Sequence, residues 1–240
     1  TDSMDSVDMK HRPQLVFDSI NRRIDAYDQA KPNAAHLSIA KFKKKWRNKA
    51  DIIHITQNID TLCEEAGDAG VFHHGSFLTS RCTECGATFP RLGLYKEGNV
   101  CPACKASGWS VRTDVVLFGE RPHGLDWIPG VLRRADVFVA VGTSGMVYPA
   151  AGFVTEARRR NCRTRLLIAK DAPLDGFQPL STENDSVGHF TKFVRGNATT
   201  VLPAVLETLG NWIEKVTQAQ ATETIATAAR DNEQPDDSAS

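Results

Sequence analysis

The sequence has no excess of charge of either sign and no long hydrophobic run. Its 29 Lys and Arg residues balance 29 Asp and Glu residues, whereas a dedicated binder of polyanions usually has a strong basic excess. No stretch reaches the roughly 18 apolar residues that a membrane span needs, and the N-terminus has no apolar signal region. These absences predict a soluble, cytoplasmic protein without a membrane partner, and they argue against nucleic acid as a partner.

The chain also lacks an initiating Met, so we expect Thr1 to be a processed or truncated start. Its 240 residues, 41% of them hydrophobic, suffice for one sizeable core and a small appended module. Residues 219–240 are rich in Ala, Thr and acidic side chains. We expect this tail to be disordered, because it has too little apolar surface to offset the entropy lost on ordering.

Four of the six cysteines form two C-x-x-C pairs, Cys82 with Cys85 and Cys101 with Cys104, and fifteen residues separate the pairs. This spacing is typical of two knuckles that hold one tetrahedral zinc ion. A redox pair or free thiols are the alternatives. Four thiolates complete the tetrahedron and leave no position for a catalytic water, so the predicted zinc is structural.

Apolar residues recur every three or four positions in three segments, which begin near Pro13, Pro32 and Pro203. This period predicts amphipathic helices. The second helix has a basic face between Lys41 and Lys49. A nucleic-acid patch is conceivable there, but a solvated helix face is the better explanation in a chain of zero net charge.

Three short runs of β-branched and apolar residues, 50–55, 136–141 and 165–169, alternate with helical patterns. Such alternation predicts an α/β fold built on a Rossmann-type parallel sheet. The cysteine module interrupts this pattern and predicts a second, smaller domain.

Polar residues directly follow the first of these runs, namely Gln57, Asn58 and Asp60. In open α/β sheets ligands bind beyond the carboxyl ends of the strands, so this cluster indicates a site for a polar small molecule. The alternative is that Asn58 and Asp60 only cap a helix over residues 60–66.

In the order of its motifs the chain resembles the sirtuins, the Sir2 family of NAD-dependent protein deacylases, and in particular its bacterial type. The matching motifs are Pro32-Asn-Ala-Ala-His36, Gln57-Asn-Ile-Asp60, His74-Gly75, the two C-x-x-C pairs, Val115-Val-Leu-Phe-Gly-Glu120, Gly142-Thr-Ser-Gly145 and Tyr148-Pro-Ala-Ala-Gly152. The resemblance covers roughly residues 13 to 210 and, because the motifs keep the family order, is far more specific than any single motif.

The resemblance implies that NAD is a co-substrate and that acyl groups, acetyl and in some members succinyl or malonyl, are removed from protein lysines. Nicotinamide and O-acyl-ADP-ribose would be the products. His74 matches the general base, a role that needs a neutral imidazole near the working pH. The partners implied are acylated lysine side chains of other proteins.

The resemblance also assigns the remaining site residues. Those that match NAD contacts are Gln57, Asn58, Ile59, Asp60, Gly142, Thr143, Ser144 and Ala198. Those that match substrate contacts are Val116, Phe118 and Gly119, in a segment that pairs with the substrate backbone as an added strand. Phe118 would line the acyl-lysine tunnel, unless it only packs in the core.

Arg23 is the candidate for reading an acidic acyl group. Some sirtuins that remove such groups carry Tyr-x-x-Arg on the corresponding helix, and here Ile20 and Arg23 match its ends. Arg23 would pair with a succinyl or malonyl carboxylate by a charge-assisted bond. The alternative is a solvated helix arginine, since Arg22 lies beside it and Ile20 has no hydroxyl.

Carried onto this chain, the family fold divides it into two domains. Residues 50–75 and 113–210 would form the NAD-binding Rossmann-type domain, and residues 13–49 and 76–112 a small helical and zinc-binding domain. The expected active site is the cleft between them.

Two departures from the family concern NAD. The Gly-Ala-Gly-x-Ser phosphate turn, with its strand and helix, and the Phe-Arg cofactor loop occur nowhere in these 240 residues, and Ile168 stands where the family has Asn. Two alternatives therefore stay open beside an active deacylase: an incomplete fragment of the enzyme, and a catalytically inactive, zinc-containing binding module. A zinc-ribbon nucleic-acid binder that uses Lys41 to Lys49 is a third.

Overall fold

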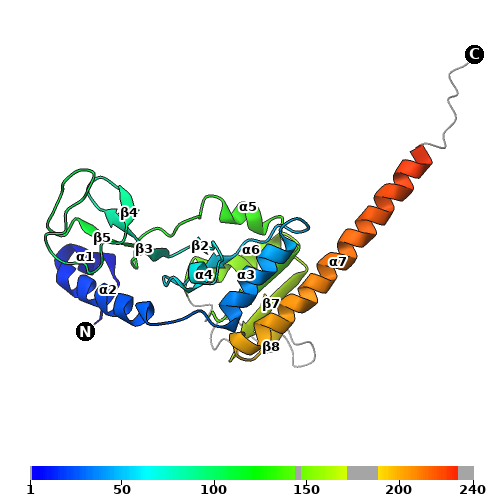
Figure 1. The fold of residues 1–240 in the computed structure, drawn as a ribbon, viewed down its shortest axis with the longest axis horizontal. Helices are drawn as coiled ribbons and strands as arrows, with labels where there is room; N and C mark the ends of the chain where they lie inside the picture. The colour runs from blue at the N-terminus through cyan, green and yellow to red at the C-terminus, as the bar shows by residue number, and fades with distance from the viewer. Residues whose placement is uncertain (1, 144–146, 172–188, 232–240) are drawn as a thin grey trace, which may run out of the picture.

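The computed structural model describes residues 2–143, 147–171 and 189–231. They form two lobes, and several segments of the chain run from one lobe to the other (Figure 1). One long helix projects from the larger lobe. The small lobe holds α1, α2 and the antiparallel strands β3, β4 and β5, whereas the larger lobe holds the parallel strands and the other helices. The helix over residues 34–46, which we expected in the small domain, therefore packs with the larger lobe instead.

The small lobe is built where α2 packs on an antiparallel sheet. α1 spans Ser6–His11 and α2 spans Pro13–Asp28. The sheet has the order β4-β3-β5, with β3 at Gly75–Cys82, β4 at Thr88–Pro90 and β5 at Val111–Val115. The periodic residues of α2 are buried against residues of this sheet, which confirms the predicted helix; this core includes Val16, Phe17, Ile20, Ile24, Phe77, Val111 and Val115.

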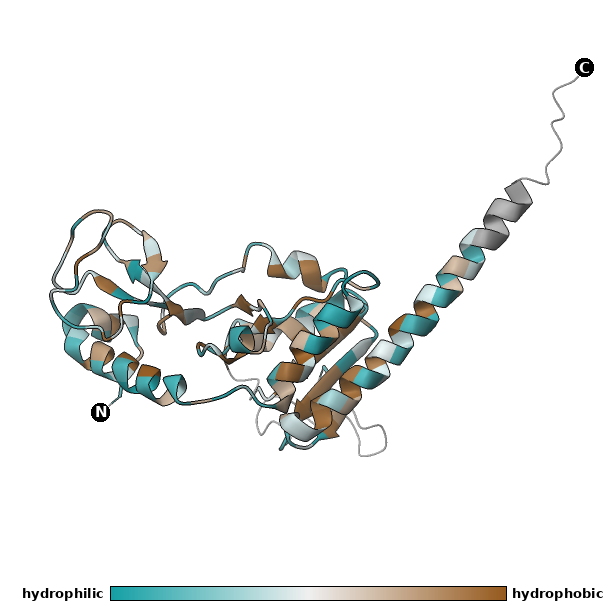
Figure 2. Cartoon of the chain, viewed as in Figure 1, coloured by the Kyte–Doolittle hydropathy of each residue, from teal (hydrophilic) through white to brown (hydrophobic). Residues whose placement is uncertain are grey.

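The larger lobe contains a parallel sheet of order β6-β7-β8, at Val137–Val141, Thr164–Ala169 and Lys192–Arg195. Both of its faces are covered. Ile168 packs with residues of α3 (Ala34–Trp46) and α7 (Ala198–Asp231), whereas Leu167 packs with Val154 of α6 (Phe153–Arg159). Neighbouring residues of a strand face opposite sides, so burial of both confirms the predicted α/β architecture. In Figure 2 these strands are largely brown, as expected for doubly covered strands.

Short elements complete this lobe. α4 spans Leu62–Glu65, α5 spans Ile128–Leu132, and a 3₁₀ turn at Ala150–Gly152 leads into α6. Strands β1 (Ile55–Thr56) and β2 (Val71–Phe72) form a separate parallel pair.

The first predicted strand is much shorter than expected. We expected a strand over residues 50–55, but only Ile55–Thr56 is in β1, and Ile53 is 41% exposed. Among the described residues β1 pairs only with β2, and β6 pairs only with β7. A strand needs a neighbour for its backbone groups, so a run without a second neighbour has less to hold it extended.

The expectation of disorder over residues 219–240 was wrong for residues 219–231, which continue α7. Ala, the commonest residue in this stretch, has the highest helix propensity, and adding a turn to an existing helix avoids the cost of nucleation. Residues 232–240 lie outside the described part of the chain. No helix of the described residues is both long and apolar enough to cross a membrane.

The edge of β6 leads to a first prediction. Unpaired backbone groups along a strand edge are a template for pairing with another chain. We expect these 240 residues to associate as concentration rises, and amides of residues 137–141 to gain hydrogen-exchange protection in the associated form. Light scattering after gel filtration checks the mass. A constant monomer mass over a hundredfold range of concentration would contradict the prediction.

Candidate functional site

The four predicted zinc ligands form one cluster. Their sulfur atoms all lie within 4.8 Å of one another, and the Cys82–Cys104 and Cys85–Cys101 distances are 3.7 and 3.8 Å. A tetrahedron with Zn–S bonds of about 2.3 Å places its sulfurs roughly 3.8 Å apart. The cysteines therefore fit a zinc ion without rearrangement.

Each C-x-x-C pair sits in a tight turn of the same design. The Gly86 amide donates to Cys82 O at 3.0 Å, and the Lys105 amide donates to Cys101 O at 3.0 Å. Gly86 and Lys105 both have a positive φ, at 73° and 65°. Backbone N–H groups of Cys104 and Ala103 that point at the Cys101 thiol lower its pKa, which favours the thiolate that a metal needs.

His74 stands between β2 and β3, beside the carboxyl end of β1. Its Nδ1 lies 3.0 Å from Gln57 O, so Nδ1–H donates and Nε2 is left as the proton acceptor. Burial lowers the pKa of His74, because the charged imidazolium loses hydration. The residue thus has the tautomer and the neutral state that a general base requires.

Gly75 fixes the position of His74 against β5. A side chain at Gly75 would place its Cβ 1.9 Å from Asp114 O, and Gly75 has a φ of +75°. Only glycine meets both conditions. The approach that results lets the Val116 amide donate to His74 O at 2.9 Å.

His73 is not oriented away from His74, as an extended segment would require. Residues 73 and 74 form a turn, and their rings lie 5.0 Å apart. His73 is fully buried; its Nδ1 lies 2.7 Å from His123 O, and the His123 amide donates to His73 O at 2.9 Å. These two contacts hold the loop after Glu120 against His73, the residue next to His74.

The predicted NAD residues come together only in part. Gln57 Nε2 donates to Thr143 Oγ1 at 3.3 Å, which joins the carboxyl ends of β1 and β6. Asp60 is 7% exposed, and its carboxylate accepts the Leu62 amide at 3.0 Å, although the N-cap residue of α4 is Thr61. Asn58 is exposed, whereas Ile59 packs against the small-lobe core.

The other predicted NAD residues lie at the ends of elements. Gly142 directly follows β6 with a φ of +62° and open space where a Cβ would be. Ala198 is the first residue of α7 and packs near Ile168 and Leu202. Ser144 lies outside the described residues.

A buried ion pair contacts the backbone of the predicted substrate segment and of the residue before it. Arg112, 2% exposed on its side chain, donates to Val115 O at 2.7 Å and to Glu120 Oε1 at 2.5 Å. The other Glu120 oxygen accepts the Leu117 amide at 2.9 Å. Arg112 was not predicted from the sequence, because Thr113 and Asp114 follow it in the same strand and no apolar pattern makes its charge stand out.

Phe118 is not a core residue, since it is 64% exposed, and Gly119 follows it with a φ of +86°. Arg23 is not simply solvated either, because it is paired with Asp2. The analysis of the sequence missed Asp2, and a contact across 21 positions leaves no local signal.

The sheet, the zinc knuckles and the polar rim at His74 define a Rossmann-type α/β protein with a metal-stabilised small domain. The Sir2 family model matches residues 1–149. An NAD-dependent protein deacylase of Caulobacter vibrioides is 41% identical over 202 residues, which are 82% of this chain and 78% of that protein. A relative of the same description in Leishmania major is 34% identical over 208 residues, 85% of this chain and 77% of that one. The chain belongs to the Sir2 family.

Solved structures agree with this membership. A Sir2 homologue in complex with NAD matches with a TM-score of 0.71 at 27% identity, over 88% of this chain and 77% of that one. A Sir2 protein bound to a propionylated peptide matches with a TM-score of 0.68 at 25% identity, over 86% and 83% of the two chains.

Metal content is the first test of the site. We expect about one zinc per chain, held by the four clustered thiolates, and Cys101→Ser should lose most of it and lower the melting temperature. Elemental analysis with thermal unfolding measures both. Cys63→Ser is the matched control, since Cys63 is buried outside the cluster. Wild-type protein that is folded with well under one equivalent of zinc would disprove the assignment.

The second test concerns the protonation of His74. Because burial lowers its pKa, the ring stays neutral at neutral pH and takes up a proton only below the ordinary pKa of an imidazole, about 6.5. We expect the NMR signal of its ring protons to titrate with a midpoint below 6.5. The spectrum of His74→Gln identifies the signal. A midpoint at or above 6.5 would mean that the ring is more hydrated than the structure implies.

Proposed function

We propose that this protein removes acyl groups from protein lysines in an NAD-dependent reaction, with His74 as general base. The observation that carries the proposal is the placement of His74. Its Nδ1–H is engaged by Gln57 O, its Nε2 is left to accept a proton, and its own carbonyl holds the Val116 amide of the substrate segment. A backbone hydrogen bond thus fixes the proposed base, His74, next to the proposed peptide-binding segment.

NAD supplies the acceptor for the acyl group and leaves as nicotinamide and O-acyl-ADP-ribose. In this chain Gln57, Asn58, Ile59, Asp60, Thr143 and Gly142 would hold its nicotinamide and ribose portion, with Ser144 and Ala198 toward the rest. The buried Asp60 carboxylate favours positive charge that develops on the ribose. The role of His74 is to take a proton from a ribose hydroxyl at Nε2.

The acyl-lysine peptide would lie along Val116–Gly119 as an added strand. Phe118 already exchanges backbone hydrogen bonds with the N-terminal segment, through its amide to Met4 O at 2.8 Å and its carbonyl to the Ser6 amide at 3.0 Å. The exposed Phe118 ring would then stand beside the acyl-lysine.

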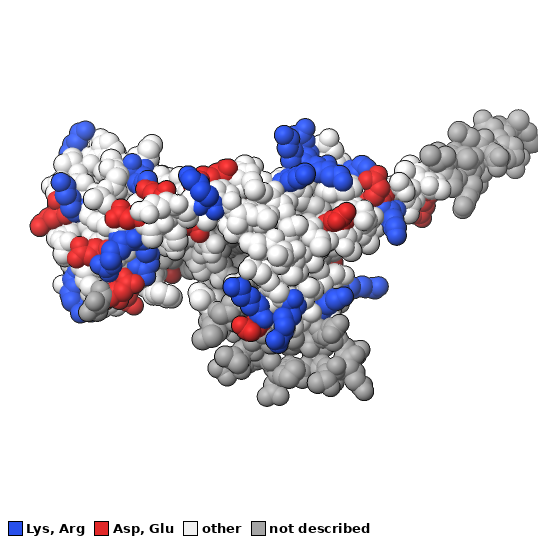
Figure 3. Space-filling view, turned by 60° about the horizontal axis from the view of Figure 1, so that its bottom comes forward, with Lys and Arg blue, Asp and Glu red and all other residues white. Residues whose placement is uncertain are grey.

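Acylated proteins are the partners in this proposal, the enzyme class is a transferase, and the compartment is the cytoplasm. Nucleic acid is not among the partners. Lys41, Lys44 and Lys45 of α3 are exposed, as a solvated face requires, whereas Lys43 is half-buried and paired with Asp68. Figure 3 shows Lys and Arg interspersed with Asp and Glu over the small lobe.

A second candidate is a module that binds acyl-lysine proteins without turning them over. It is favoured by one observation, namely that the sequence contains no Gly-Ala-Gly-x-Ser turn while β1 and β6 have no common partner strand among the described residues. A helix N-terminus with such a turn is the usual seat of an NAD diphosphate. NAD affinity, measured by calorimetry on this chain, separates the two candidates.

The test of the catalytic proposal is His74→Ala. General-base catalysis contributes about 10²- to 10⁴-fold, so we expect deacylation to fall by at least about a hundredfold. Binding of the acyl-lysine peptide, measured by fluorescence anisotropy, should change little, because the base acts on the transition state.

His11→Ala is the matched control, since His11 is exposed at the end of α1. Deacylation within twofold or so of wild type in His74→Ala would remove His74 from its role. Equal losses in both variants would point to a general effect on folding.

A further inference from the structure

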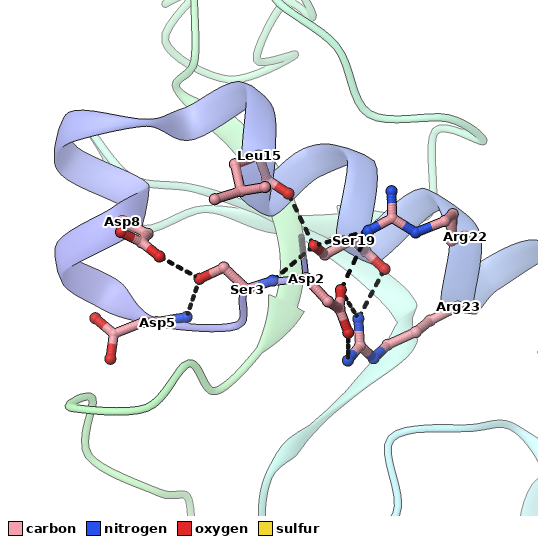
Figure 4. Close-up of polar contacts among 8 residues, drawn as sticks. All are labelled: Asp2, Ser3, Asp5, Asp8, Leu15, Ser19, Arg22 and Arg23. Carbon is pink, nitrogen blue, oxygen red and sulfur yellow. Dashed lines mark hydrogen bonds and ion pairs between the residues drawn. The ribbon is translucent and has the colours of Figure 1, made fainter.

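The segment Asp2–Ser6 connects the predicted acyl-reading residue to the substrate segment. At one end Asp2 contacts Arg22 and Arg23 on α2, and at the other end Met4 and Ser6 pair with Phe118 (Figure 4 shows the α2 end). Between them the Ser3 amide donates to Ser19 Oγ at 2.9 Å. The segment is therefore held at several points, and Asp2 is not a free chain end.

The guanidinium fork of Arg23 is occupied. Nη1 donates to Asp2 Oδ1 at 2.8 Å and to Ser19 O at 3.0 Å, and Nη2 donates to Asp2 Oδ2 at 2.5 Å. This is the parallel two-bond geometry in which arginine binds carboxylates most strongly. Hydrogen bonds from Arg23 are the main reason why the pKa of Asp2 lies well below its usual range.

Arg23 stands on the helix that packs against the substrate segment. Ile20, one turn before it, is fully buried in the same cluster as Val115 and Leu117. The Asp2–Ser6 segment also lies against Gly119, where a Cβ would meet Ser6 Oγ at 2.6 Å. The predicted substrate segment and Arg23 are thus connected through Ile20 of the same helix and through the Asp2–Ser6 segment.

We propose that Asp2 sets the acyl preference of this protein, because its carboxylate occupies Arg23 and disfavours acyl groups that end in a carboxylate relative to neutral ones. The proposal rests on the proposed function, in which the acyl-lysine lies along Val116–Gly119. A succinyl or malonyl group has to displace Asp2 from Arg23, whereas an acetyl group does not.

Displacement is unfavourable even though the ion pair is partly exposed. An isolated surface ion pair contributes little. Asp2, however, is tethered beside Arg23 by the contacts of Ser3, Met4 and Ser6, so it competes with the ligand as an intramolecular group at high effective concentration. A second carboxylate that approaches the same guanidinium is also repelled by the first.

The experiment compares two peptides of one sequence that carry acetyl-lysine or succinyl-lysine, with dissociation constants measured by anisotropy and without any need for turnover. Wild-type protein should bind the acetyl peptide more tightly. Asp2→Asn should strengthen succinyl binding by about tenfold relative to acetyl binding, since it frees a charge-assisted two-bond site. The double variant with Arg23→Gln should lose that gain.

Asp25→Asn is the matched control, because Asp25 is an exposed carboxylate on α2, two positions from Arg23, and its removal changes the net charge equally. It should leave the ratio of the two constants unchanged. An unchanged ratio in Asp2→Asn, even with a lower melting temperature, would show that Asp2 only supports the fold and would overturn the proposal. A ratio that shifts further toward acetyl would overturn it as well, since Asp2 would then orient Arg23 for the ligand. If neither peptide binds any variant, the proposed function itself fails.

Discussion

The close approach of β3 to β5 at Gly75 is the constraint on which the rest of the site depends. A glycine with positive φ lets Asp114 O come within a distance that excludes any side chain. That contact sets the pairing at the start of β3, with Gly75 opposite Val115, whereas a register shift between Ser76 and Ser80 separates it from the pairing of Cys82 with Val111. At the start of β3, the carbonyl of His74 accepts the Val116 amide. At its other end, β3 reaches the first zinc ligand, Cys82.

Two kinds of polar contact then hold the site in place. Short-range contacts set the state of each residue, as when Gln57 O fixes the His74 tautomer. Buried charge sets the position of whole segments, as when the Arg112–Glu120 pair braces the backbone between Val115 and Leu117. A buried ion pair of this kind is costly to break, because removing one partner leaves the other unpaired. The backbone of the predicted substrate segment is thereby held at Val115 and Leu117.

Local pattern predicted the helices and the zinc cluster well, because period and spacing are properties of neighbouring residues. The α2 and α3 helices and the strands β6 and β7 lie within a few residues of the predicted segments. Contacts between distant segments were not predictable in this way. Gln57 meets Thr143 across 86 positions and Arg23 meets Asp2 across 21, and neither pairing has a periodic signature. The extent of β1 and of α7 was also missed, since one depends on a partner strand and the other on propagation from a packed helix.

β3 has one further consequence for the protein. The same eight-residue strand begins directly after His74 and ends at the first zinc ligand, Cys82. It pairs with β5 at both of its ends, with a register shift between Ser76 and Ser80. If the peptide binds as proposed, metal and peptide would act on the same pair of strands from opposite ends. Thermodynamic linkage would make that relation reciprocal: whatever the metal added to peptide affinity, the bound peptide would add to metal affinity. On that proposal, protein with bound substrate would retain its zinc more firmly than protein without it.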